Sequence, residues 1–114
     1  MPTIINLTDH QKYQKLVRSD ICFNKQEFDQ LLSVYSQHVM TGEWKDYAIH
    51  HDPAMAAFLI YQKSSSHPSY TIVKSKTGVE NNPEFFVYQG AKRLKKSFSL
   101  KSALTVLKKL ELVI

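Results

Sequence analysis

The stretch FNKQEFDQLLSVYSQHVMTG, from Phe23 to Gly42, carries the clearest structural signal in the sequence. Asn24 followed three positions later by Glu27 matches a capping box, the pattern that opens a helix. Apolar residues then recur at helical spacing: Phe28, Leu31, Leu32, Tyr35 and Val39. Gly42 is placed to end the helix in a left-handed turn. The spacing predicts a helix over residues 25–41 with one apolar face.

After Gly42 the hydrophobic pattern changes to one typical of β-strands. It predicts four strands, at residues 47–51, 56–62, 70–74 and 85–89, and leaves open a short fifth strand at residues 92–98. The short polar connections between them favour antiparallel neighbours. A last amphipathic helix begins after Ser99, with one apolar face: Leu100, Ala103, Leu104, Leu107 and Leu110. The sequence therefore predicts an α+β fold, with a helix, a four- or five-stranded antiparallel sheet and a helix, both main helices lying on one sheet face.

The chain of 114 residues is long enough for one hydrophobic core but too short for two ordinary domains. We expect a single α+β domain over residues 21–114, preceded by an arm or short helix at residues 1–20. Cys22 is the sole cysteine, and the first residues lack the continuous apolar run of a signal peptide. No stretch approaches membrane-spanning length. These features predict a cytoplasmic protein with no membrane partner.

Positive charge is concentrated at the C-terminal end of the chain. The formal net charge is +5, yet acidic and basic residues nearly balance before residue 85. Five basic residues at the last hairpin and helix start are candidate contacts to phosphate or nucleic acid: Lys92, Arg93, Lys95, Lys96 and Lys101. Phe85, Phe86 and Tyr88 precede them as candidate stacking groups for bases. A plain solvated basic surface is the competing interpretation.

The run ICFNKQEFDQLLSVYSQHVMTGEWKDYAI, residues 21–49, resembles the start of an uncharacterised bacterial family of proteins of unknown function, DUF2794. The likeness is most specific at GEWKDYAI, residues 42–49. It continues through AAFLIYQK, PSYTIVK and the lysine-bearing end KKSFSLKSALTVLKKLELV, so that it covers residues 21–114. The resemblance implies a small bacterial domain, and it supplies no catalytic residue or cofactor.

Residues 50–52, His-His-Asp, form the cluster best suited to proton transfer or metal binding. Side chains alternate along a strand, so His50 and Asp52 can cooperate whereas His51 faces the other way. The spacing of the other histidines offers no closing set of ligands. We interpret the cluster as polar residues at a strand end and expect no metal, cofactor or catalytic residue.

Cys22 precedes the N-terminus of the first helix, a position that can make a thiol reactive. Its neighbours Ile21 and Phe23 favour burial instead. We predict that Cys22 is a small residue of the core or its margin.

The functional hypotheses follow from what the sequence lacks and from its aromatic residues. Phosphate-binding glycine loops and serine-hydrolase motifs are absent. The leading hypothesis is a small non-enzymatic interaction domain for protein–protein contact or self-association, and the alternative is a nucleic-acid-associated protein. The candidate partner surface consists of aromatic residues: Trp44, Tyr47, Phe58, Phe86 and Tyr88. For Trp44 and Tyr47 the competing interpretation is that both rings cover the junction between helix and sheet.

The predicted strands are apolar on both sides. In the strand at residues 56–62, two alternating sets point opposite ways: Ala56, Phe58 and Ile60 against Ala57, Leu59 and Tyr61. Two helices on one face can bury only one set, and an exposed apolar patch is typical of a binding surface. We expect a homodimer to cover it. The alternative cover is the N-terminal arm of the same chain, through Ile4, Ile5, Leu7, Leu16 and Val17.

Overall fold

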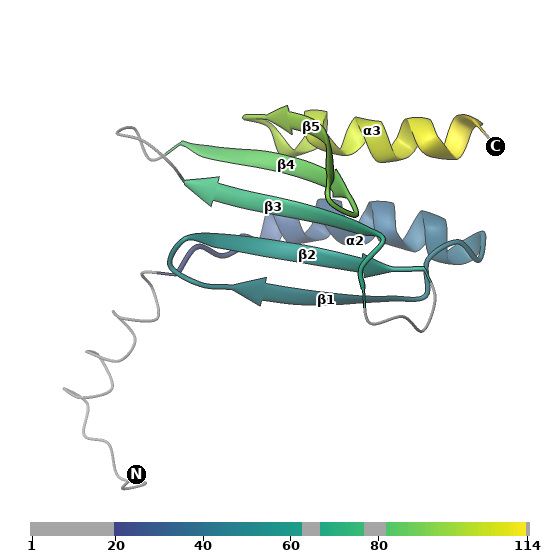
Figure 1. The fold of residues 1–114 in the computed structure, drawn as a ribbon, viewed down its shortest axis with the longest axis horizontal. Coiled ribbons are helices and arrows are strands. Elements are labelled where there is room, and N and C mark those ends of the chain that lie inside the picture. The colour runs from purple at the N-terminus through teal and green to yellow at the C-terminus, as the bar shows by residue number, and fades with distance from the viewer. Residues whose placement is uncertain (1–19, 63–66, 77–81, 114) are drawn as a thin grey trace, which may run out of the picture.

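A five-stranded antiparallel sheet and two helices make up the part of the chain that the structure describes (Figure 1). The computed structural model describes residues 20–62, 67–76 and 82–113, with side chains as far as residue 108. The elements in chain order are α2 (Lys25–Met40), β1 (Asp46–His51), β2 (Met55–Tyr61), β3 (Tyr70–Lys76), β4 (Pro83–Gln89), β5 (Lys92–Ser97) and α3 (Leu100–Val113). The predicted arm at residues 1–20 lies outside the described residues, except for Asp20.

Each strand pairs with the next one along the chain, so the sheet order is β1-β2-β3-β4-β5 and every pair is antiparallel. This order follows from the short connections, which cannot carry the chain across the sheet. The helix–sheet–helix fold predicted from the sequence is confirmed, and the sheet has five strands where the sequence left four or five open.

The capping box at the start of α2 is present in full. The Asn24 side chain accepts a hydrogen bond from the backbone N–H of Glu27 at 2.8 Å, and the backbone N–H of Asn24 donates to the Glu27 carboxylate at 2.9 Å. At the other end the helix stops at Met40, and Gly42 has a φ of +82°, in the left-handed region that favours glycine. The predicted helix is therefore correct to within one residue at its C-terminus.

Both helices pack on the same side of the sheet, as predicted. In Figure 1 they lie behind the strands, and side chains from both enter one buried cluster. From the helices this cluster takes Leu31, Val34, Leu100, Ala103, Leu104 and Leu107, and from the strands Phe58, Ile60, Tyr70, Ile72, Phe85 and Val87. The α2 and α3 helices also contact each other, so together they form a single layer.

The strand register decides which side chains share the opposite side, which we call the outer face. Residues paired across neighbouring strands point to the same side of a sheet. Two cross-strand rows of the outer face span all five strands. The first row consists of Ala48, Leu59, Thr71, Tyr88 and Arg93, and the second of His50, Ala57, Val73, Phe86 and Lys96. Both described helices lie on the other side, so neither covers these rows.

A buried ion pair ties the start of α2 to the middle of the sheet. The Lys74 ammonium on β3 donates to the Glu27 carboxylate at 2.7 Å and to the Cys22 carbonyl at 2.8 Å, and the Lys74 side chain is only 8% exposed. A buried ammonium is tolerated only when such partners replace water. Glu27 therefore has two roles, since the same oxygen that accepts from Lys74 also completes the capping box.

Candidate interaction surface

The centre of the outer face is apolar. Leu59, Thr71 and Val73 are half-buried there by their neighbours within the sheet, and Ala57 is buried. The Phe86 and Tyr88 rings stack with their centroids 6.3 Å apart and their planes at 26°. Strands of six or seven residues in a five-stranded sheet give the whole outer face, its charged rim included, an area on the order of 400 Å². Its apolar centre inside a charged rim makes this face a candidate interaction site.

One edge of the outer face is basic because of a β-bulge. The register between β4 and β5 shifts between Val87 and Tyr88, so that Tyr88 pairs with Arg93 and Val87 with Lys95. Leu94 is the extra residue, and it packs against the core.

The bulge places two cations on one surface. Arg93 and Lys96 are three positions apart and would point to opposite faces of a regular strand, but the extra residue turns both to the outer face. Each lies with its cationic centre 5.9 Å from the centroid of the Phe86 ring. Lys96 also pairs with Glu84 at 3.1 Å. Within the described ranges, Arg93 makes no ion pair.

The opposite edge of the outer face is acidic. Asp46 begins β1 and is exposed beside Tyr61, its cross-strand partner. Asp52 follows β1 and meets His50 of the second row, with 3.0 Å between its Oδ2 and the His50 Nε2. That hydrogen bond, together with those from the Met55 and Ala54 amides, lowers the pKa of Asp52 below its ordinary value. A carboxylate so held stays ionised over a wide pH range.

The five predicted phosphate contacts do not converge on one surface. Arg93 and Lys96 lie on the outer face, whereas Lys95 aligns with the core residue Val87 on the helix side of the sheet. Lys92 lies at the exposed start of β5. Lys101 belongs to α3 and lines a separate groove between the helices.

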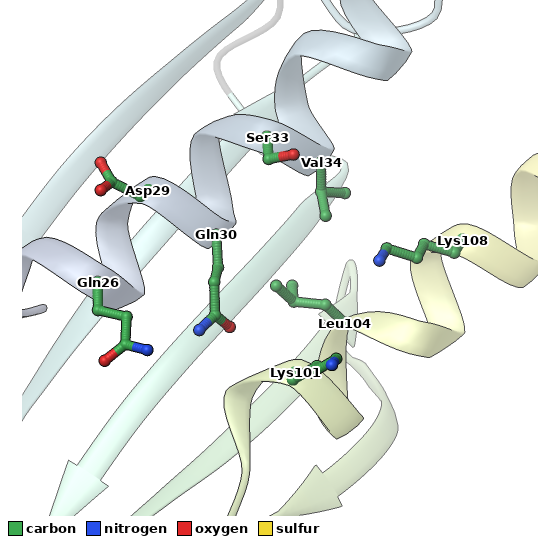
Figure 2. A pocket seen from close by; sticks show the side chains of 8 residues that line it. All are labelled: Gln26, Asp29, Gln30, Ser33, Val34, Lys101, Leu104 and Lys108. Atoms are coloured by element: carbon green, nitrogen blue, oxygen red, sulfur yellow. The ribbon is translucent and has the colours of Figure 1, made fainter.

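This groove has a volume of about 480 Å³ and is drawn in Figure 2. Val34 and Leu104, both buried, face each other from the two helices. Its remaining lining is polar and comes from both helices: Gln26, Asp29, Gln30, Ser33, Lys101 and Lys108.

The structure divides the five aromatic candidates for a partner surface. Trp44 is 3% exposed and Phe58 0%, so both are core residues. The Tyr47 ring stacks on Phe58 at a centroid distance of 4.9 Å and covers the sheet beside α2. Only Phe86 and Tyr88 lie on the outer face.

The side chains of the polar cluster at residues 50–52 lie on both faces of the sheet, as strand alternation predicts. His50 meets Asp52 on the outer face, while the Nδ1 of His51 lies 3.1 Å from a carboxylate oxygen of Asp20 on the helix side. In the part of the chain that the structure describes, no three metal-ligating side chains come together. Sequence reasoning missed the second pair because its members are 31 residues apart and no local pattern connects them.

The predicted burial of Cys22 is wrong, since its side chain is exposed. The reason is the extended segment before α2. Ile21 donates its amide to the Asp52 carbonyl at 2.9 Å and turns its side chain inward, where it is 8% exposed. Phe23 packs against the core, so alternation sends the Cys22 side chain outward.

Sequence reasoning also missed a histidine at the end of α2. His38 is buried and stacks on Trp44 at 4.0 Å, with its Nδ1 3.1 Å from a Glu43 carboxylate oxygen. The signal for it lay in the sequence after the helix, where Gly42 turns Glu43 and Trp44 back toward the last helical turn. We interpret His38 as a structural residue that holds the segment after α2 against the last turn of the helix.

Comparison with known proteins is informative at the level of the family. A family model described as "Protein of unknown function (DUF2794)" matches residues 21–104. The chain belongs to this family. The matched residues include α2, all five strands and the start of α3, so the match covers most of the helix–sheet–helix core. No curated protein and no solved structure matches the chain. None of the helices in the described ranges is both long and apolar enough to span a membrane.

Proposed function

We propose that this chain is a non-enzymatic interaction domain of the bacterial cytoplasm, which binds a protein surface through the outer face of its sheet. One observation carries the proposal. Both described helices pack on one face of the sheet, although the centre of the other face is also apolar. Complete burial of an exposed Leu or Val side chain contributes about 1.5–3 kcal/mol. Leu59 and Val73 are already half-buried, so each offers a partner part of this free energy.

The distribution of polar groups supports binding rather than bond-making chemistry. The charged groups Arg93, Lys96 and Asp46 lie at the rim of the outer face, and the centre is formed by Leu59 and Val73. An apolar centre inside a polar rim is the ordinary anatomy of a protein–protein interface.

Site-specific photocrosslinking in cells tests this proposal whichever protein the outer face binds. A photoreactive phenylalanine analogue at Leu59 should give a discrete crosslinked adduct. The same analogue at Ser33, an exposed position on α2, should not. Absence of any adduct from Leu59, with the variant folded and expressed, would contradict the proposal.

A second candidate function, nucleic-acid binding, is favoured by one arrangement on the same face. The stacked Phe86 and Tyr88 rings lie beside Arg93 and Lys96, which combines base-stacking groups with phosphate-binding cations. It has less support because Lys95 and Lys101 lie elsewhere and Lys96 is partly neutralised by Glu84.

Binding of a mixed single-stranded DNA or RNA probe at low salt tests this second candidate. The candidate requires an affinity that falls steeply as salt rises and that is lost when Arg93 and Lys96 are both replaced by Glu. Absence of binding even at low salt would exclude it.

A further inference from the structure

We infer that the occupant of the outer face is a second copy of this chain, in a two-fold dimer in which β1 of each copy lies across β5 of the other. This inference rests on the proposed function and names its partner. It follows from the positions of the rim charges.

The outer face has charges of opposite sign at its two edges. Arg93 and Lys96 project from β5, and Asp46 and Asp52 flank β1 at the far edge. Within residues 20–62, 67–76 and 82–113, neither Arg93 nor Asp46 takes part in an ion pair, so each remains available to a partner. Two copies of such a surface are complementary when the basic edge of each lies against the acidic edge of the other.

Two sheets that pack face to face have two simple two-fold arrangements. In the first, the axis is parallel to the strands, so β5 of one copy lies over β1 of the other. Each cross-strand row then lies over the same row of the other copy, running in the opposite direction. In the second, the axis lies in the plane of the sheet perpendicular to the strands, so β5 lies over β5, β1 lies over β1, and the first row of one copy lies over the second row of the other. The second arrangement sets Arg93 against the other copy's Lys96, and Asp46 against the other copy's Asp52. Like charges held together oppose association, so the charges select the parallel axis.

The parallel-axis arrangement brings opposite charges within reach. Arg93 shares its row with Ala48, and Asp46 lies two residues along β1 from Ala48. Two residues of a strand span about 7 Å, a distance that the long Arg side chain and the twist between packed sheets can close. Lys96 shares its row with His50, next to Asp52, but it is already paired with Glu84, so the charge selection rests mainly on Arg93 and Asp46.

The apolar centre is compatible with the same arrangement. A two-fold axis along the middle strand β3 places Thr71 and Val73 over their own copies and Leu59 over Tyr88 of the other copy. Interdigitated side chains of this kind form the core between packed sheets about 10 Å apart. The apolar centre then supplies most of the binding free energy, and the charged edges fix the orientation.

Charge exchange between Arg93 and Asp46 tests the inference directly. Purified full-length protein should be a dimer by light scattering, and the single variants Arg93→Asp and Asp46→Arg should each weaken self-association about tenfold or more, because each change creates two like-charge contacts. A mixture of the two single variants should form a heterodimer, since both of its contacts are then between opposite charges. The double variant Arg93→Asp/Asp46→Arg should dimerise by itself.

Lys101→Asp is the matched control, because it makes the same charge change on α3, away from the outer face, and should leave the dimer intact. Failure of the mixed single variants to associate, with all variants folded by circular dichroism, would overturn the arrangement. A monomeric wild-type protein would overturn the dimer itself.

The outcome of photocrosslinking separates the two proposals. An adduct from position 59 to a different protein would keep the interaction surface and reject the second copy. Conversion of a wild-type monomer into a dimer on deletion of residues 1–19 would assign the face to the chain's own N-terminal segment and would equally reject the second copy.

Discussion

On β2, Phe58 and Ile60 are 0% and 1% exposed beneath the helices, whereas their neighbours Leu59 and Tyr61 on the outer face remain half-buried. On β2 both faces have large apolar side chains, so composition does not distinguish the faces of this strand. The faces differ in what packs on them, since α2 and α3 both pack on the inner face and neither packs on the outer face. Under the proposed function, a partner supplies the cover that the outer face lacks among the described residues.

The largest predicted difference between the two faces is in how much their ion pairs stabilise the fold. Glu27→Ala removes the carboxylate that faces buried Lys74 and should destabilise the domain by about 3–5 kcal/mol. Lys96→Ala removes the outer pair with Glu84, where the Lys96 side chain is 51% exposed, and should cost less than about 1 kcal/mol. Urea denaturation measures both. Equal losses for the two variants would contradict the distinction between the faces.

Truncation of neighbouring apolar residues on β2 sharpens the same comparison. Ile60→Ala opens a cavity in the core and should reduce the free energy of unfolding by about 2–5 kcal/mol at any protein concentration. Leu59→Ala should have a small effect on the folded monomer and a larger one on association, so its effect should depend on protein concentration. A concentration-independent loss as large as that of Ile60→Ala would show that Leu59 belongs to the core.

The smallest predicted effect concerns the rim of the outer face. The pKa of Asp52 lies below its ordinary value, chiefly because His50 donates a hydrogen bond to it. Because the pKa is lower in the folded state, the stabilisation is present above the unfolded pKa and is lost as the pH falls through the folded one. His50→Ala should raise the pKa of Asp52 toward its ordinary value, as followed by carboxyl NMR shifts. An unchanged titration would show that the backbone amides alone hold the carboxylate.

The sequence predicts most of the fold because its signals are local. The capping box at Asn24 and Glu27, the helical spacing after it and the alternation on β2 each involve residues a few positions apart. Alternation also predicts that Phe86 and Tyr88 share a face, as the structure confirms.

The features that the sequence could not predict depend on distant residues or on irregular register. The Lys74–Glu27 pair spans 47 positions, and the bulge that turns Arg93 and Lys96 to one side has no marker such as glycine. Without that bulge, regular alternation would separate the two cations. The candidate surface thus combines a predictable apolar centre with an edge whose charge arrangement required the structure.

Light scattering of the wild-type protein beside Leu59→Arg shows whether the outer face joins two copies of this chain. We expect a wild-type species of twice 13.2 kDa at micromolar concentration. Leu59→Arg should be a folded species of 13.2 kDa with the circular dichroism spectrum of the wild type, because the charge enters the centre of the outer face and leaves the core intact. A wild-type protein of 13.2 kDa, or a Leu59→Arg variant that still dimerises, would contradict the claim that the outer face joins two copies of this chain.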